Sequence, residues 1–114
     1  MFLKPDYNLK SIYEINLEEL KSLGIKAILF DLDSTLMASK SGYYTEETQK
    51  WLNNVRENFF IAVISNNKNP NYIQKVRNIS NFPLLFDAGK PRISRTKKFL
   101  KNYDLNPKEC AFVG

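Results

Sequence analysis

The 114-residue chain predicts an α/β fold in which a parallel β-sheet carries helices on both faces. Three observations predict it: short apolar runs recur along the chain, helical patterns lie between them, and no repeat, low-complexity tract or long linker interrupts the alternation. Strands that alternate with helices at this spacing form βαβ units, and these units build a parallel sheet. The length suits a single domain over residues 1–114.

Four helices are expected from start signals and apolar periodicity. Asn16 begins a capping-box pattern, and Gly24 is a natural helix stop. Thr45 opens a second helix, Pro70 stands at the first position of a third, and a fourth follows Pro91. The residues expected to face inward are Trp51, Leu52 and Val55 in the second helix, Tyr72, Ile73 and Val76 in the third, and Ile93, Phe99 and Leu100 in the fourth.

Four short apolar runs are of the buried-strand type. Parallel sheets bury both faces, so their strands read as continuous apolar runs rather than as alternating patterns. The expected strands cover residues 27–30, 60–64, 84–86 and 111–113. Strand and helix therefore follow one another in a three-layer, Rossmann-like arrangement, with the fourth strand at the end of the chain.

Composition limits the chemistry and the compartment. The chain has no histidine, which excludes His-based triads and His-ligated zinc and leaves acid–base work to carboxylates, lysine, tyrosine or water. The single cysteine, Cys110, permits no internal disulfide and suits a reducing compartment. No run approaches the ~20 apolar residues of a membrane span, and the start of the chain lacks the order of a signal peptide. We therefore expect a cytoplasmic protein.

Polar residues fall where three predicted strands end, and ligands of open parallel sheets bind beyond these ends. Asp31 and Asp33 follow the first strand, Ser65 and Asn66 follow the second, and Lys90 lies after the third. Two carboxylates one residue apart can share Mg²⁺ and a phosphate, and an aspartate can act as a nucleophile beside a second, proton-transferring carboxylate. The Ser65 hydroxyl, the main-chain N–H groups around Asn66 and the Lys90 ammonium are expected to hold the phosphate. Each signal alone also occurs in ordinary turns and caps, so their ordered placement carries the prediction.

This ordered set resembles the motifs of the haloacid dehalogenase-like (HAD) phosphohydrolases. The D-x-D-x-T-L motif matches residues 31–36, the Ser or Thr that ends an apolar strand matches Ser65, and the Lys before a helix matches Lys90. The resemblance implies that Asp31 is the nucleophile and a Mg²⁺ ligand. It implies that Asp33 is the general acid/base and lends its main-chain carbonyl to the metal, while Ser65 and Lys90 hold the phosphoryl group.

A narrower resemblance covers the chain from near Phe2 to Gly114. A Pro-Asp pair, then L-G-I-K, D-L-D-S-T-L, I-S-N-N and G-K-P are similar to the YqeG-type phosphatases of HAD subfamily IIIA. That group is similar to the mitochondrial phosphatidylglycerophosphate phosphatases. Ser34 stands where the group usually has Asn, and residues 68–70 stand where it often carries Arg. Both differences bear on substrate choice more than on the reaction.

The spacing of the motifs leaves no room for a cap domain. One loop and one helix fill the gap from Asp33 to Ser65, and the same holds from Ser65 to Lys90. An uncapped site is open to lipid headgroups, phosphoproteins or nucleic-acid ends. The resemblance implies a phosphorylated substrate, with phosphatidylglycerophosphate as the leading candidate, and peripheral contact with the inner face of the membrane. No DNA partner is expected.

The fourth HAD motif places a metal-binding Asp after the glycine that ends the fourth strand. Gly114 matches that glycine, and the resemblance therefore implies a third carboxylate just after it and a HAD-like core whose C-terminal part is missing. Weak or absent Mg²⁺ binding and turnover are expected of such a chain. Residues 90–114 hold seven basic and two acidic residues, so the whole net charge of +5 lies there. A basic helix face can meet an anionic surface, although a solvated face is the simpler interpretation.

Two other functions stay open. The chain fits a catalytically inactive HAD-like binding module that uses its uncapped face and basic helix to dock RNA, a GTPase or an anionic membrane surface. It also fits a phospho-acceptor receiver domain, which likewise pairs acidic residues with a lysine in a parallel sheet. The D-x-D-x-T-L order after the first long strand favours the phosphatase over the receiver domain.

Overall fold

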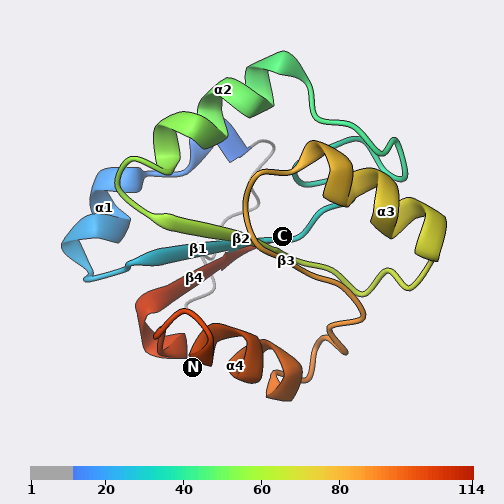
Figure 1. Ribbon diagram of the computed structural model, residues 1–114. Helices are drawn as coiled ribbons and strands as arrows, with labels where there is room; N and C mark the ends of the chain where they lie inside the picture. Colours follow the sequence, from blue (N-terminus) through green and yellow to red (C-terminus); the bar gives the residue numbers. More distant parts are fainter. Residues whose placement is uncertain (1–11) are drawn as a thin grey trace.

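The computed structural model describes residues 12–114, and the Pro5-Asp6 pair noted above lies outside them. The described chain alternates strands and helices as the sequence predicts (Figure 1). In chain order the elements are η1 (Ile12–Glu14), α1 (Leu17–Ser22), β1 (Ala27–Phe30), α2 (Glu46–Val55), β2 (Phe60–Ile64), α3 (Pro70–Ile79), β3 (Leu84–Leu85), α4 (Ser94–Lys101), η2 (Pro107–Glu109) and β4 (Cys110–Val113).

The strands form one four-stranded parallel sheet in the order β3-β2-β1-β4. Ala27 in β1 is in register with Phe60 on one side and with Cys110 on the other. Val63 in β2 is in register with Leu84 in β3. The α/β, Rossmann-like fold class predicted from the sequence is therefore confirmed, and β1 lies at the centre of the sheet.

Two apolar layers cover the two faces of the sheet. Successive strand residues point to opposite faces, so Ile28 and Phe30 pack with Val76 of α3 in one core cluster. Leu29 packs with Leu100 of α4 in the other. Figure 1 shows the same division, with α1, α2 and α3 on one side of the sheet and α4 on the other. The expectation of helices on both faces is met.

The helix start signals work as predicted in three of four cases. The side chains of Asn16, Thr45 and Asn69 accept hydrogen bonds from the main-chain N–H groups of the first turns of α1, α2 and α3. The fourth helix differs, because α4 begins at Ser94 and not directly after Pro91. The Arg92 N–H donates to the Gly89 carbonyl at 3.0 Å, so these residues form a turn before the helix begins.

Strand bounds differ from the prediction by single residues. Phe86 falls outside β3, and β4 begins at Cys110, one residue before the predicted range 111–113. Both residues are buried, so the apolar runs correctly predicted which residues are buried. The ends of the strands differ because they are decided by the hydrogen bonds between neighbouring strands. Gly24 ends the first helical segment with φ of 79°, a left-handed conformation that glycine adopts without strain.

The strand order reverses direction beside β1. From β1 the chain passes to β2 and β3 on one side, and then returns to place β4 on the other side. Open parallel sheets bind ligands at such a reversal, outside the carboxyl ends of the strands. Asp31 and Gly114 lie there, after β1 and β4, and the Asp31 N–H donates to the Val113 carbonyl at 2.9 Å.

Within residues 12–114 we find no helix with the length and apolar character needed to cross a membrane.

Candidate active site

Asp31 lies at the carboxyl end of the central strand, with one carboxylate oxygen held by two donors. Asp31 Oδ1 accepts from the Leu32 N–H at 2.9 Å and from Lys90 Nζ at 3.0 Å. No described residue donates a hydrogen bond to Oδ2. Gly114 packs against the same side chain, because a Cβ built on it would lie 2.9 Å from Asp31 Cβ. The carboxylate is therefore fixed in orientation while one of its oxygens stays available.

Lys90 supplies a cation to Asp31 from the loop after β3. Its side chain is 21% exposed and that of Asp31 is 39% exposed, so solvent reaches the pair from one side. Lys90 Nζ also lies 4.9 Å from the centroid of the Phe112 ring, within cation–π distance. The sequence prediction that Asp31 and Lys90 share one site is consistent with this contact, which joins residues 59 positions apart.

Asn66 holds the main chain of Lys90. Asn66 Oδ1 accepts from the Lys90 N–H at 2.8 Å, and Asn66 Nδ2 donates to the Lys90 carbonyl at 3.0 Å. A carboxamide can serve both main-chain groups of one residue because it carries a donor and an acceptor. The sequence suggested only that N–H groups around Asn66 bind phosphate, so this clamp was missed. The sequence signal for it was the amide side chain of Asn66 shortly after β2, because β2 is the neighbour of β3 and Lys90 lies on the loop after β3.

Ser65 lies at the carboxyl end of β2, where the sequence placed it. The residue is 3% exposed, and its Oγ accepts from the Asn67 N–H at 3.1 Å. Its hydroxyl donates to no residue within 12–114, although buried polar groups usually find partners. The Ser65 hydroxyl is therefore a donor free to meet a ligand at this edge of the sheet.

Asp33 lies in a tight loop after Asp31 and faces α3. Its Oδ1 accepts from the Tyr72 hydroxyl at 2.5 Å and from the Lys40 N–H at 2.9 Å. Burial raises the pKa of Tyr72, and the hydrogen bond to Asp33 raises that pKa further. The phenol thus remains a hydrogen-bond donor in neutral solution. Sequence reasoning counted Tyr72 only as a core residue and missed its contact with Asp33.

Oxygen ligands for Mg²⁺ are present but few. Mg²⁺ is usually held by one or two carboxylates together with substrate phosphate and water. Asp31 offers a partly exposed carboxylate, and the main-chain carbonyl expected from Asp33 is an oxygen donor of the kind that Mg²⁺ takes, so the donor types fit that ion. In the part of the chain that the structure describes, no group of three or more His, Cys, Asp or Glu residues is placed to hold a metal.

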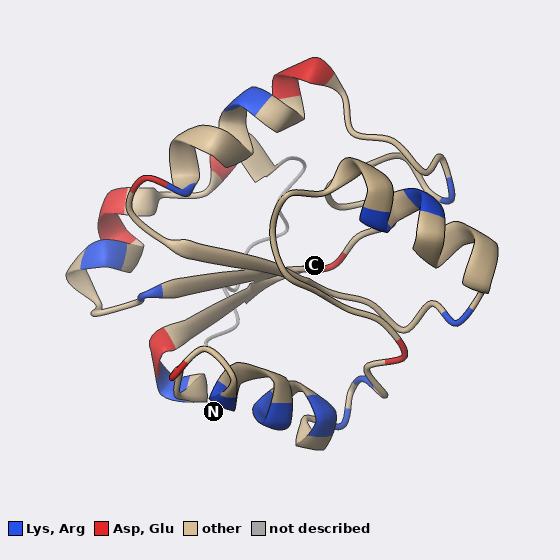
Figure 2. Cartoon of the chain, in the orientation of Figure 1, with Lys and Arg blue, Asp and Glu red and all other residues tan. Residues whose placement is uncertain are grey.

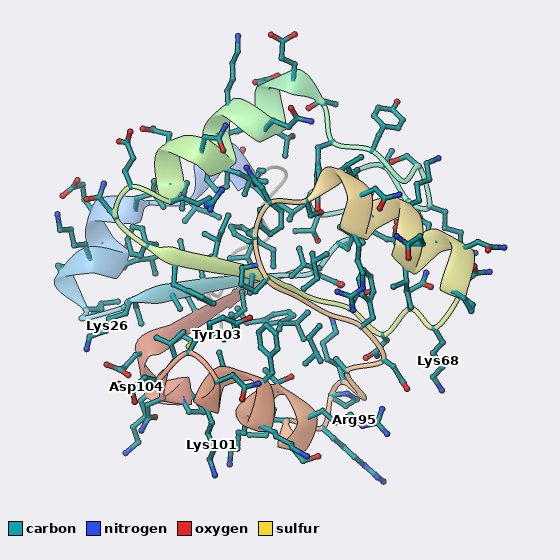
Figure 3. All side chains as sticks on the ribbon, viewed as in Figure 1. Lys26, Lys68, Arg95, Lys101, Tyr103 and Asp104 are labelled. Carbon is teal, nitrogen blue, oxygen red and sulfur yellow. The ribbon has the colours of Figure 1, made fainter. Side chains whose placement is uncertain are left out.

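A basic hollow of about 490 Å³ opens beside Lys90. It lies between the loops that follow β2 and β3, and Figure 3 shows Lys68 and Arg95 reaching outward near it. Arg95 Nη1 donates to the Asp87 carbonyl at 2.6 Å and lies 3.1 Å from Asp87 Oδ1, which holds the guanidinium in place. The charged residues that line the hollow are Lys68, Lys90, Arg92, Arg95 and the single carboxylate Asp87.

Further Lys and Arg residues line α4, as Figure 2 shows. The exposed ones include Arg95, Lys98 and Lys101. This agrees with the basic helix face predicted from the sequence, and Arg95 of that face also lines the basic hollow.

Three other residues singled out in the sequence have structural positions. Tyr44 is buried and its hydroxyl lies 2.7 Å from Ser80 Oγ, whereas Tyr43 is 59% exposed. Cys110 is buried in β4, and burial raises the pKa of its thiol to about 11. A protonated thiol is a poor nucleophile, so Cys110 fills space as the sequence predicted.

Comparisons with known proteins add one relative. No protein-family model matches the chain, and no solved structure matches it. A match was found to Probable phosphatase YqeG of Bacillus subtilis (strain 168), with 26% identity over 113 residues. The matched region covers 99% of this chain and 66% of the relative. The chain is thus similar, over nearly all of its own length and about two thirds of the relative's, to a protein named as a probable phosphatase.

Proposed function

We propose that this protein is a phosphomonoester hydrolase of the HAD type, with Asp31 as its nucleophile. The contact between Lys90 Nζ and Asp31 Oδ1 carries the proposal, because it joins a cation to an ordered carboxylate at the strand reversal. The similarity to a probable phosphatase along 99% of the chain supports the same reaction class. Nucleophilic catalysis by an aspartate divides one difficult displacement into two easier ones.

In the first step, Asp31 Oδ2 forms a bond to phosphorus while the bond from phosphorus to the leaving oxygen breaks. Asp33 gives its proton to that leaving oxygen, and an aspartyl-phosphate remains. In the second step, water gives a proton to Asp33, and the oxygen of that water forms a bond to phosphorus. The bond between phosphorus and the Asp31 oxygen then breaks and releases phosphate. Lys90 and the Ser65 hydroxyl bind the phosphoryl oxygens, where negative charge builds up.

Mg²⁺ belongs to the proposal as the expected cofactor. The Asp31 carboxylate and the Asp33 main-chain carbonyl would hold it, and it would supply positive charge to the phosphoryl oxygens. Gly114 lies close to this carboxylate, because a Cβ built on Gly114 would lie 3.6 Å from Asp31 Oδ2.

For the substrate, we propose phosphatidylglycerophosphate, hydrolysed at the inner face of the membrane by a cytoplasmic protein in peripheral contact with it. The uncapped site and the basic hollow beside Lys90 support an anionic headgroup. The basic face of α4 supports contact with anionic lipid, since such surfaces attract Lys and Arg. These points favour an anionic headgroup at a lipid surface over a small phosphate ester in solution.

The test is phosphate release by variants of the full-length protein. Asp31→Asn and Asp33→Asn are each compared with Asp104→Asn, a control at an exposed residue on the α4–η2 loop (labelled in Figure 3). We expect Asp31→Asn to lose Mg²⁺-dependent hydrolysis, Asp33→Asn to retain only a reduced rate, and the control to retain full activity. Activity that survives Asp31→Asn would overturn the aspartyl-phosphate mechanism. No phosphate release from any ester by the wild type would favour an inactive binding module instead.

A further inference from the structure

The hydroxyl of Tyr72, a residue of α3, donates a hydrogen bond to the carboxylate of Asp33, which lies 39 positions away in the chain. The phenol donates to Asp33 Oδ1 at 2.5 Å and lies 3.4 Å from Met37 Sδ. At its other end, the Tyr72 N–H donates to the Asn69 side chain at 3.1 Å, which fixes the first turn of α3. The ring packs against the larger core cluster. The hydroxyl is therefore presented by a held side chain.

Asp33 Oδ1 has a second hydrogen-bond donor. The Lys40 N–H donates to it at 2.9 Å. The intervening loop is closed by a hydrogen bond from the Ser34 N–H to the Met37 carbonyl at 2.8 Å, with Ser34 at φ of 65°. Two donors thus converge on one oxygen of Asp33. No residue within 12–114 donates a hydrogen bond to the other oxygen, Oδ2.

We propose that Tyr72 is a positioning residue that fixes the Asp33 carboxylate so that Oδ2 transfers the proton. This inference rests on the proposed function, in which Asp33 protonates the leaving oxygen as its bond to phosphorus breaks and then takes a proton from water. With the Tyr72 hydroxyl in place, rotation about the Cβ–Cγ bond of Asp33 would break two hydrogen bonds. Without it, only the contact with the Lys40 N–H opposes that rotation.

A purely structural role for Tyr72 predicts a different pattern of activity. Loss of packing would disturb the whole site and slow every substrate alike. Misplacement of a general acid slows only those reactions in which the leaving oxygen needs a proton. An alkyl phosphate needs that proton, because an alkoxide is a poor leaving group. A 4-nitrophenyl phosphate needs it far less, because 4-nitrophenolate is stable as an anion.

The experiment measures kcat/KM of the full-length protein on glycerol phosphate and on 4-nitrophenyl phosphate. For Tyr72→Phe we expect a loss of about tenfold or more on the alkyl ester and less than about threefold on the aryl ester. Tyr44→Phe is the matched control, since Tyr44 is a buried tyrosine whose hydroxyl bonds to Ser80 near the other end of α3. The control should change both substrates equally. Urea unfolding of both variants verifies that they are folded.

A double-mutant cycle with Asp33→Asn provides the second measurement. If Tyr72 acts through Asp33, Tyr72→Phe causes no additional selective loss on the alkyl ester in the Asp33→Asn background. Equal losses on both esters, no loss on either, or a selective loss that persists without Asp33 would overturn the positioning role. Hydrolysis that survives Asp31→Asn, or no hydrolysis by the wild type, would instead overturn the proposed function and this inference with it.

Discussion

Lys90 Nζ reaches Asp31 Oδ1 at 3.0 Å although their strands are not neighbours. Lys90 follows β3, Asp31 follows β1, and β2 lies between them in the sheet. The lysine must therefore cross the carboxyl end of β2, and Asn66, which follows that strand, holds its main chain there through two hydrogen bonds. The site thus depends on all three strand ends at once.

Removing the cation should reduce hydrolysis without unfolding the protein. Loss of one donor that stabilises charge in a transition state costs about 10²–10³ in rate, and we expect Lys90→Met to lose about that much in kcat/KM. Lys98→Met, on the exposed face of α4, is the matched control and should retain activity. Steady-state kinetics on 4-nitrophenyl phosphate check this. Equal activities of the two variants would exclude Lys90 from the phosphoryl site.

Substitution of Asn66 should reduce activity, because the Asn66 side chain holds the main chain of Lys90 in place. Asn66→Asp keeps the acceptor for the Lys90 N–H but replaces the donor to the Lys90 carbonyl with an oxygen. An unmade hydrogen bond of this kind costs roughly 1–3 kcal/mol, so we expect kcat/KM to fall by about tenfold. The control is Asn54→Asp, which adds the same charge on the exposed side of α2. A fall of the same size in the control would show that charge alone is responsible.

Whether a contact can be predicted from the sequence depends on how far apart its two residues lie along the chain. Asn16 and Thr45 cap their helices as predicted, because a cap is decided within one helical turn. The meeting of Asp31 and Lys90 was also predictable, since the carboxyl ends of parallel strands share one edge. The Tyr72–Asp33 contact was not predictable, because it depends on the side-chain conformation of two residues brought together only by the packed α3.

The core on the α4 side of the sheet should be sensitive to truncation of Leu100. Leu100 is fully buried, whereas Leu23 is 61% exposed. Deleting a buried leucine side chain to alanine costs about 2–5 kcal/mol, so Leu100→Ala should lower the free energy of unfolding by that amount. Leu23→Ala should change it by less than about 0.5 kcal/mol. Urea unfolding measures both, and similar losses would contradict the assignment of Leu100 to the core.

The Lys26–Glu109 ion pair predicts an acid-side pH dependence of stability. The hydrogen bond and charge of Lys26 lower the pKa of Glu109 from its ordinary value of 4.5. A lowered folded-state pKa contributes stability above pH 4.5, and that stability is lost as the pH falls through the folded value. Wild type should therefore exceed Glu109→Gln in stability at neutral pH, and the difference should shrink as the solution is acidified. A difference that grows on acidification would contradict the lowered pKa.

The most direct test of the central claim is to trap the phosphorylated enzyme. The full-length protein is mixed with labelled phosphate ester and Mg²⁺, quenched in acid within one turnover and digested, and the label is located by mass spectrometry. We predict label on the peptide that contains Asp31, and none in Asp31→Asn. Rapid phosphate release with no label on Asp31 at any quench time would contradict the assignment of Asp31 as the nucleophile.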